Sequence, residues 1–401
     1  TKGNLLVAAA AGAGKTAVLV ERIIRKITDP VHPMDIDRLL VVTFTNAAAA
    51  EMRERIGLAV SQALEKNPSS QHLQRQLTLL NKAHITTIHS FCLDVLRSNF
   101  QLINIDPNFR IADETEGMLM KWEVLDRLFE EIYEEEEEDP VFYELLDSYG
   151  GNRDDRALQD MVLNLYHFIQ SSPWPKKWLD EMTERFRKSG DGDFGQTSWG
   201  KVLLDMINLE LSGMRLMLEV AIRILSRSPG AEKNLAVFAE DLSLIESLQK
   251  ICQGESSQIW DTLCQKIRDV QFRRLYPAGK KGDPEKHEQA KKLRDEMKTR
   301  LKKIRDELCS YDLKDIWQDM ESLYPLMKGL ARLVKKFDAL YKEKKSRKGV
   351  VDFNDLEHMC LEILTNPSGP AAAYRESFLE IYVDEYQDSN MVQELIIKLI
   401  S

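Results

Sequence analysis

The chain has 401 residues, of which 43% are hydrophobic and 30% are charged. A chain of this length can bury a sizeable core in two or three domains, and this composition excludes collagen-like, disordered and membrane-spanning proteins. Lysine and arginine number 55 against 65 aspartates and glutamates, which gives a formal net charge of −10. Any nucleic-acid site must therefore be a local surface.

The cysteines and the two ends of the chain set further limits. The five cysteines lie far apart without a Cys-x-x-Cys pair, at Cys92, Cys252, Cys264, Cys309 and Cys360. This pattern predicts reduced thiols in a cytoplasmic protein rather than a disulfide framework or a zinc site. The apolar stretch at residues 5–11 is far too short to cross a bilayer, so no membrane association is expected. Because the chain starts at Thr1 and stops within an apolar helix at Ser401, we expect a fragment of a longer protein.

The first hundred residues alternate between predicted strands and helices. Short apolar runs predict buried strands at residues 4–8, 38–44 and 85–88. Helical patterns follow each strand, over residues 15–27, from Ala47 towards Leu64 with Asn46 as the cap, and after residue 88. Strand–helix alternation of this kind indicates an α/β domain with a parallel sheet.

The pattern changes after about residue 105. Residues 114–348 show long helical patterns rich in Glu, Lys, Leu and Arg, without a sustained heptad repeat, which indicates a compact bundle. A helix at 353–364 and a strand at 379–383 then resume the α/β pattern. We therefore predict an α/β phosphate-loop NTPase domain formed by residues 1–104 and 349–401, interrupted by a large all-α inserted domain at 105–348.

A candidate phosphate loop follows the first predicted strand. Residues 9–16 read AAAGAGKT and open a helix, as a Walker A motif does, with Ala9 where the first glycine usually stands. The small residues let backbone N–H groups approach phosphate oxygens, Lys15 would reach the β- and γ-phosphates, and Thr16 would bind Mg²⁺. A small-residue turn with a chance lysine is the simpler alternative, which the strand-before, helix-after context disfavours.

The last predicted strand ends in two carboxylates, Asp384 and Glu385. In phosphate-loop NTPases such a strand lies beside the first one and delivers an aspartate to the metal. Asp384 is then the Mg²⁺ partner and Glu385 the general base that polarises the attacking water. An Asp-Glu pair at a strand end is common by itself and gains meaning only from the upstream phosphate loop.

Four segments in order resemble motifs of superfamily 1 DNA helicases of the UvrD/Rep type. They are residues 42–55 (VTFTNAAAAEMRER), 86–91 (TTIHSF), 352–356 (DFNDL) and 384–388 (DEYQD). This resemblance implies a RecA-like motor domain that uses ATP and Mg²⁺. The implied ATP-binding residues are Ala9, Ala10, Ala11, Gly12, Ala13, Gly14, Lys15, Thr16 and Gln387, with Lys15, Asp384 and Glu385 catalytic.

The same resemblance implies a track for single-stranded DNA. Its residues are Phe44, Thr45, Asn46, Thr87, His89 and Ser90. An aromatic face that stacks on a base, with hydroxyl and amide groups on phosphates, suits binding without sequence preference. Simpler interpretations are open: Phe44 as a core residue, His89 as a cap or a half-buried histidine, and Asp352 as the N-cap of the next helix.

Within the family, residues 6–20 and 38–55 most resemble the helicase–nuclease subunits of bacterial AddAB (RexAB-like) complexes. This likeness implies helicase and exonuclease activities in double-strand-break repair, with movement from 3′ to 5′. It also implies a heterodimer with an AddB/RexB-like subunit. The glutamine segment that recognises adenine, the second motor domain and the nuclease domain would lie outside this sequence.

Alternative interpretations remain at this point. A stand-alone UvrD/Rep-type repair helicase would carry the same motifs without a nuclease. A structural DNA-tethering ATPase of the SMC type also separates its two nucleotide motifs by a long helical insert, but it would need heptads and an LSGGQ-like signature. The basic runs at residues 291–305 and 342–348 could meet duplex DNA, although a solvated helix face is the favoured interpretation.

Overall fold

The computed structural model describes residues 3–10, 13–134, 139–150, 155–187, 194–254, 258–277 and 283–401. Ala11 and Gly12 of the predicted phosphate loop lie outside these residues. The chain divides into two compact units. The first comprises Thr1–Met182 with Lys328–Ser401, and the second comprises Thr183–Met327.

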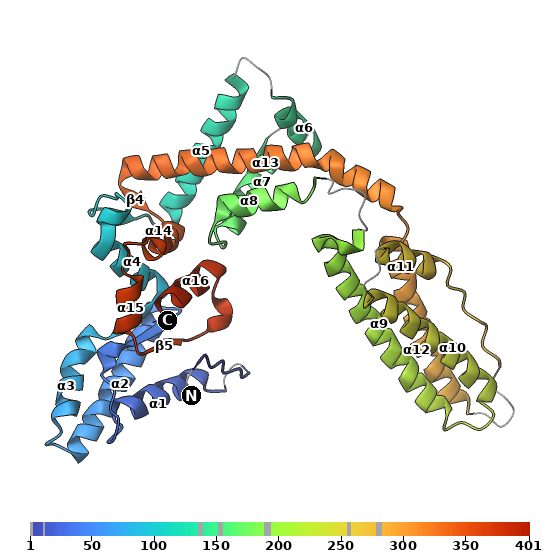
Figure 1. Ribbon diagram of the computed structural model, residues 1–401, viewed down its shortest axis with the longest axis horizontal. Helices are drawn as coiled ribbons and strands as arrows, with labels where there is room; N and C mark the ends of the chain where they lie inside the picture. The colour runs from blue at the N-terminus through green and yellow to red at the C-terminus, as the bar shows by residue number, and fades with distance from the viewer. Residues whose placement is uncertain are drawn as a thin grey trace. The chain divides into compact units, whose positions relative to one another are not determined.

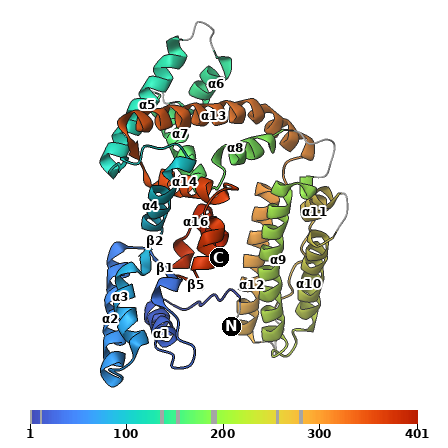
Figure 2. The same ribbon diagram turned by 60° about the vertical axis from the view of Figure 1, so that its left-hand side comes forward.

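The first unit is built on a three-stranded parallel sheet. Its strands are β1 (Leu39–Thr43), β2 (His84–Thr87) and β5 (Glu380–Val383), in the order β2-β1-β5. Val41 of the central strand is aligned with Ile85 on one side and Tyr382 on the other. Figure 2 shows the three strands between the helices of this unit. The parallel sheet predicted from the alternation of strands and helices is confirmed.

Helices cover both faces of this sheet. Leu39 and Val41 join one apolar cluster with α1 (Lys15–Ile27), α2 (Asn46–Lys66) and α3 (Gln71–Leu79). Leu40 and Val42 join the other with α4 (Ile88–Asn99), α14 (Phe353–Thr365) and α16 (Met391–Ile400). Successive side chains of a strand point to opposite faces, so a strand covered on both sides must be apolar throughout, as β1 is. The first unit is therefore a three-layer α/β/α arrangement.

The strand predicted at residues 4–8 is wrong. These residues form no strand, and Leu5, Leu6 and Val7 are 59%, 74% and 59% exposed. A strand takes its backbone hydrogen bonds from a neighbour, and no described segment pairs with this one. Without a neighbour or a covering helix, an apolar run of this length stays extended and exposed.

The cap of α2 also differs from the prediction. The side chain of Thr45, not Asn46, accepts the hydrogen bond from the N–H of Ala48, at 3.1 Å, and Asn46 is the first helical residue. Threonine is a good N-cap, since its hydroxyl satisfies an N–H that lacks a partner within the helix. Farther along the same helix, the exposed side chains of Glu51 and Arg55 form an ion pair, with 2.5 Å between Oε1 and Nη2.

Between the β2–α4 segment and α14 the chain is almost entirely helical. In the described parts of residues 112–349 no strand occurs. The helices of the first unit in this stretch are α5 (Glu114–Glu134), α6 (Pro140–Tyr149), α7 (Arg156–Ile169) and α8 (Pro175–Glu184), which crosses into the second unit. The 36-residue helix α13 (Leu313–Lys348) begins in the second unit and ends in the first.

The two ends of the helical stretch lie next to each other within the first unit. Strand β3 (Arg110–Ile111) pairs in parallel with β4 (Val350–Val351). This pairing, which sequence patterns did not predict, joins the residue ranges on either side of the helical stretch. The first unit also contains α15 (Ala371–Ser377) and short 3-10 turns at Ile36–Arg38, Leu80–Lys82, Phe100–Leu102 and Tyr386–Asp388. A further 3-10 turn, Phe194–Gln196, belongs to the second unit.

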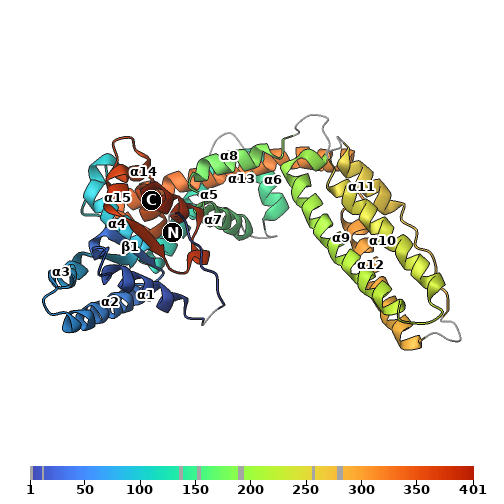
Figure 3. The same ribbon diagram turned by 60° about the horizontal axis from the view of Figure 1, so that its bottom comes forward.

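The second unit is a helical bundle with its own core. It consists of α9 (Ser198–Leu225), α10 (Glu232–Cys252), α11 (Ile259–Arg268), α12 (Pro284–Glu307) and the first turns of α13. Figure 3 shows α9, α10 and α12 side by side. No described helix of either unit is both long and apolar enough to cross a membrane.

Candidate functional site

Three candidate motifs meet at one edge of the parallel sheet. Phe44 follows the end of β1, Ile88 and His89 follow the end of β2, and Asp384 follows the end of β5. Parallel strands all end at the same edge, and ligands of open α/β sheets bind outside those carboxyl ends. The sheet topology therefore explains why segments distant in sequence form one candidate site. Figure 2 labels the three strands together, and Figure 1 shows α2, α4 and α16, the helices that follow them, in the same part of the molecule.

The described part of the phosphate loop turns sharply into α1. Gly14 has a φ of 79° and immediately precedes the first helical residue, Lys15. This left-handed conformation favours glycine, and a Cβ built there would meet nothing within 4 Å. The Ala13 N–H donates to the Ala10 carbonyl at 3.2 Å, and the Lys15 ammonium donates to the Ala9 carbonyl at 3.1 Å. Two hydrogen bonds, one of them from the lysine, thus link the described residues on either side of Ala11 and Gly12.

The phosphate loop and the acidic strand end are in direct contact. The Thr16 hydroxyl donates a hydrogen bond to Oδ2 of Asp384 at 3.0 Å, and both side chains are partly buried. The two residues are separated by 368 positions in the sequence. The N–H of Asp384 also donates to the Val42 carbonyl at 2.9 Å, which extends the β1–β5 pairing and fixes the aspartate at the sheet edge.

Glu385 has an unusual backbone conformation beside this contact. Its φ is 52° and its ψ is 45°, in the left-handed region, and Asn104 is the other described non-glycine residue with positive φ. A residue held in this region costs free energy and often marks a functional site. The Gln387 amide donates to the Glu385 carboxylate, so the predicted ATP-binding glutamine holds the predicted base.

The candidate DNA residues after β1 lie on the surface. Phe44 is 70% exposed, and Thr45 and Asn46 are exposed as well. The alternative that Phe44 belongs to the core is therefore wrong. Thr45 is occupied as the N-cap of α2, while its carbonyl accepts from the Thr43 hydroxyl at 3.0 Å. An apolar ring next to a helix N-terminus presents both a stacking face and N–H groups to the same solvent-facing edge.

The candidates after β2 differ among themselves. Thr87 is buried and N-caps α4, since its Oγ1 accepts from the Ser90 N–H at 3.2 Å and donates to the Ser90 hydroxyl at 2.9 Å. Ser90 is partly buried. The His89 side chain is 37% exposed, and its ring lies 4.9 Å from the Phe353 ring. Thr87 therefore shapes the start of α4, whereas His89 and Ser90 keep some surface exposed.

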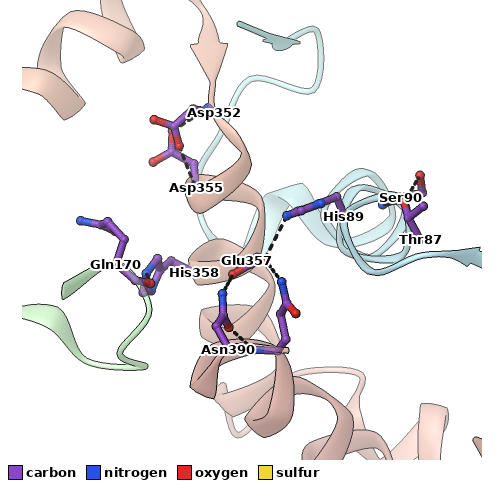
Figure 4. A network of polar contacts seen from close by, with 10 residues as sticks. Thr87, His89, Ser90, Gln170, Asp352, Asp355, Glu357, His358 and Asn390 are labelled. Atoms are coloured by element: carbon purple, nitrogen blue, oxygen red, sulfur yellow. Dashed lines mark hydrogen bonds and ion pairs between the residues drawn. The ribbon is translucent and has the colours of Figure 1, made fainter. Parts of the chain in front are cut away.

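Glu357 is a site residue that sequence reasoning missed. Its side chain is 3% exposed, and its carboxylate contacts Nε2 of His89 at 3.0 Å, Nδ2 of Asn390 at 2.9 Å and Nε2 of Gln393 at 2.6 Å. Figure 4 shows Glu357 between the start of α4 and the start of α16. A single glutamate on an amphipathic helix gives no sequence signal of this role.

The DFNDL segment forms the start of α14. Asp352 is its N-cap, as the capping alternative predicted, and the structure adds a reciprocal capping box between Asp352 and Asp355. Lys345, near the end of α13, contacts both carboxylates, at 2.9 Å and 2.5 Å, with its side chain 3% exposed. Burial raises the pKa of Asp352, but the charge and hydrogen bond of Lys345, together with the Asp355 N–H and the charge of Lys121, outweigh burial and hold that pKa below its ordinary value.

Curated relatives share this sequence at high identity. The chain is 59% identical to an ATP-dependent helicase/nuclease subunit of Acetivibrio thermocellus, over 99% of this chain and 32% of that protein. It is 53% identical to the protein of the same name from Ruminiclostridium cellulolyticum and 49% identical to that from Clostridium novyi, each over 99% of this chain and 32% of the relative. The chain thus spans about a third of the length of these relatives.

A family comparison covers the whole chain. The profile described as "UvrD/REP helicase N-terminal domain" matches residues 1–401. That span includes the phosphate loop, the acidic strand end and the long helical stretch between them. The chain therefore belongs to the UvrD/REP helicase N-terminal domain family.

Proposed function

We propose that this chain is the N-terminal part of the motor of an ATP-dependent DNA helicase–nuclease. The observation that carries the proposal is the 3.0 Å hydrogen bond between Thr16 and Asp384, which unites a phosphate loop with an acidic strand end. Membership of the UvrD/REP family and the names of the relatives support the same activity.

Thr16 and Asp384 suit a magnesium ion bound with ATP. Both offer oxygen ligands, which Mg²⁺ prefers. Their oxygens lie 3.0 Å apart, so both would be available to the same ion, directly or through water. Bound Mg²⁺ would neutralise charge on the phosphate oxygens.

Other residues of the loop and the acidic motif would act on the nucleotide. The backbone of residues 9–14 and the start of α1 would face the phosphates, where N–H groups favour anions. Lys15 would exchange the Ala9 carbonyl for the β- and γ-phosphates. Glu385, held by Gln387, would take a proton from the attacking water.

The proposed fold of the motor is RecA-like, with residues 1–104 and 349–401 as its domain and residues 105–348 as an inserted, 1B-like helical domain. The parallel order β2-β1-β5 and the mainly helical described residues between Ile111 and Val350 support this arrangement.

Single-stranded DNA would cross the carboxyl edge of the sheet. Phe44 would stack on a base. The DNA backbone would be held by Thr45, Asn46, His89 and Ser90. Thr87 would contribute by capping the helix that carries His89 and Ser90. Hydrolysis of ATP would drive stepwise movement from 3′ to 5′, and duplex DNA would be opened ahead of the strand. Sequence preference would be slight, because no base-edge reader is apparent.

The full-length protein would act in a heterodimer. The relatives are named as one subunit of a helicase/nuclease, which supports an AddB/RexB-like protein as the partner. The word nuclease in the same name supports a nuclease domain elsewhere in the protein. Repair of double-strand breaks in bacterial chromosomal DNA would set its place of action in the cytoplasm.

Two substitutions in the full-length protein test the nucleotide site. Lys15→Ala should abolish ATP binding and ATP hydrolysis. Glu385→Gln should remove hydrolysis, to below about 1% of the parent rate, while ATP still binds, because the base is lost and the metal ligand Asp384 remains. Binding of a fluorescent ATP analogue and release of phosphate measure the two effects separately.

Glu21→Gln is the matched control, because Glu21 is an exposed carboxylate on α1 whose partner is Arg25. It should keep both binding and hydrolysis. Hydrolysis by Glu385→Gln at the parent rate would show that Glu385 is not the base. Hydrolysis by Lys15→Ala at the parent rate would show that the phosphate loop does not take part in ATP hydrolysis.

A further inference from the structure

The Glu357 carboxylate joins two segments that the proposed function treats separately. His89 belongs to the DNA track after β2, whereas Asn390 and Gln393 start α16, directly after the acidic motif. Oε1 of Glu357 accepts hydrogen bonds from the side chains of His89 and Gln393, and Oε2 accepts one from the side chain of Asn390. Every contact joins α14 to a segment that follows the carboxyl end of a sheet strand.

The charge state of Glu357 suits this position. Burial alone raises its pKa, but the hydrogen bonds from His89, Asn390 and Gln393 outweigh burial and hold that pKa below its ordinary value. Glu357 is therefore ionised at neutral pH and accepts hydrogen bonds only. The His89 ring nitrogen that faces it, Nε2, must then carry a proton, which fixes how the ring is oriented.

Asn390 transmits this contact to the acidic segment. Its Oδ1 accepts the N–H of Gln393 at 2.8 Å as the N-cap of α16, while its Nδ2 donates to Glu357. Both ends of the Asn390 amide are thus engaged, so the start of α16 cannot turn without changing the bond to Glu357. Only a short 3-10 turn separates the acidic motif from Asn390. The bond between Asn390 and Glu357 therefore fixes the C-terminal end of that turn.

Packing alone does not require an ion at this place. The faces of α4, α14 and α16 are otherwise joined by apolar side chains such as Cys92, Leu361 and Ile396. A buried ion loses its hydration, and an apolar side chain of similar volume often stabilises a core as well or better. The Glu357 carboxylate instead fixes the relative positions of its three hydrogen-bond donors, one of which is the half-exposed His89 ring.

We propose that Glu357 is a positioning residue that couples occupancy of the DNA edge at His89 to the conformation of the acidic ATP motif through Asn390. The proposal rests on the proposed function, since it assumes that His89 meets DNA and that Asp384 and Glu385 act on ATP. DNA that draws His89 towards a phosphate changes its bond to Glu357, and the Asn390 cap responds.

The test measures ATP hydrolysis by the full-length protein in complex with its partner, with and without single-stranded oligonucleotide. Glu357→Gln keeps the shape of the side chain but replaces one carboxylate oxygen, a hydrogen-bond acceptor, with an NH₂ group. That group would face a donor of His89, Asn390 or Gln393. The ratio of the two rates should fall at least about fivefold, the lower end of typical coupling between sites. A merely structural loss would lower both rates together and leave their ratio unchanged.

Glu362→Gln is the matched control, because Glu362 is an exposed carboxylate on the same helix. It should keep the parental ratio. His89→Ala should lower the ratio as Glu357→Gln does, and the double variant should be no worse than the more impaired single variant, since both break one linkage. Additive losses in the double variant would overturn the coupling.

A second variant protects the test if Glu357→Gln does not fold. Asn390→Ser keeps a good N-cap for α16 but removes the donor to Glu357, so it breaks the same linkage without altering the buried charge. Its ratio should also fall about fivefold or more. A parental ratio in the folded variants refutes the coupling alone, whereas a parent enzyme that DNA does not stimulate refutes the proposed function itself.

Discussion

At the scale of the residue, Phe44 is the most informative single side chain of the candidate DNA track. Its ring is 70% exposed although it follows a strand that is buried along its whole length. Exposing a phenyl ring forgoes roughly 1.5–3 kcal/mol of burial free energy, and a stacked base would recover such a loss. This balance makes Phe44 a better candidate for DNA contact than Thr45, whose hydroxyl is engaged as the N-cap of α2.

Phe44→Ala in the full-length protein should weaken binding of single-stranded oligonucleotides about tenfold or more. Stacking contributes about 1–3 kcal/mol per base, and 1.4 kcal/mol is a factor of ten in the dissociation constant. Fluorescence anisotropy of a labelled oligonucleotide measures the affinity. Stimulation of ATP hydrolysis by DNA should fall in parallel.

Leu58→Ala supplies the control, because Leu58 is a large apolar residue of α2 that is 56% exposed but lies three turns from the sheet edge. It should bind oligonucleotides as the parent does. If Phe44→Ala and Leu58→Ala are alike, the DNA track does not include Phe44.

The sequence allowed prediction of the residues that carry a motif, but not of those that act through position. Thr16 and Asp384 were identified from local patterns, and their contact follows from strands that end at one edge. Lys345 and Arg294 lie in basic runs that resemble solvated faces, yet both are buried ion partners, Lys345 of Asp352 and Arg294 of Asp241. Their partners come from other helices, which no local pattern indicates.

At the scale of the element, predictions succeeded where an element's stability is local and failed where it needs a neighbour. Helix α1 was predicted with its observed bounds, because its apolar spacing and its glycine start are local signals. Residues 4–8 have an equally clear apolar pattern but no strand to pair with. The β3–β4 pair has only two residues in each strand, too few for a pattern, and depends on the return of the chain.

The junction of α13 and α14 yields a stability prediction. Lys345→Met should destabilise the start of α14, because Asp352 and Asp355 would remain buried without their cation, a loss of about 3–5 kcal/mol in comparable pairs. Hydrogen exchange of the α14 amides should accelerate more than about 100-fold. Lys344→Met is the control, since the partner of Lys344, Glu123, is 61% exposed and such pairs contribute at most about 1 kcal/mol.

The same variant should show a defined pH dependence. In the parent, burial already raises the pKa of Asp355. Without Lys345, the two facing carboxylates would hold a proton that the unfolded chain releases, so the folded state binds more protons and its stability falls as pH rises. Exchange of the α14 amides, after correction for intrinsic rates, should therefore be accelerated least near pH 4, close to the ordinary aspartate pKa of about 3.9, and increasingly as the pH rises. An effect independent of pH would contradict this account of the ion cluster.

At the scale of the whole molecule, the division into two units has a physical basis in separate cores. One apolar cluster lies entirely within residues 194–320 and includes Ile207, Leu211 and Trp260, each at most 1% exposed. The same unit contains a buried ion pair, with 2.5 Å between Nε of Arg294 and Oδ2 of Asp241. The Arg294 guanidinium also donates a hydrogen bond to the Arg273 carbonyl at 2.8 Å. None of these groups depends on the parallel sheet.

Residues 183–327, produced alone, should therefore fold into a helical bundle. Far-ultraviolet circular dichroism should show a largely helical spectrum that is lost in one cooperative transition in urea, because a single core joins its helices. Arg294→Ala should lower the urea midpoint strongly, since Asp241 would be left buried without a partner. Arg300→Ala, which removes a 43% exposed arginine from the same helix, should leave the midpoint near that of the parent. A gradual loss of helix without a transition, or equal effects of the two substitutions, would mean that the bundle takes its stability from the first unit.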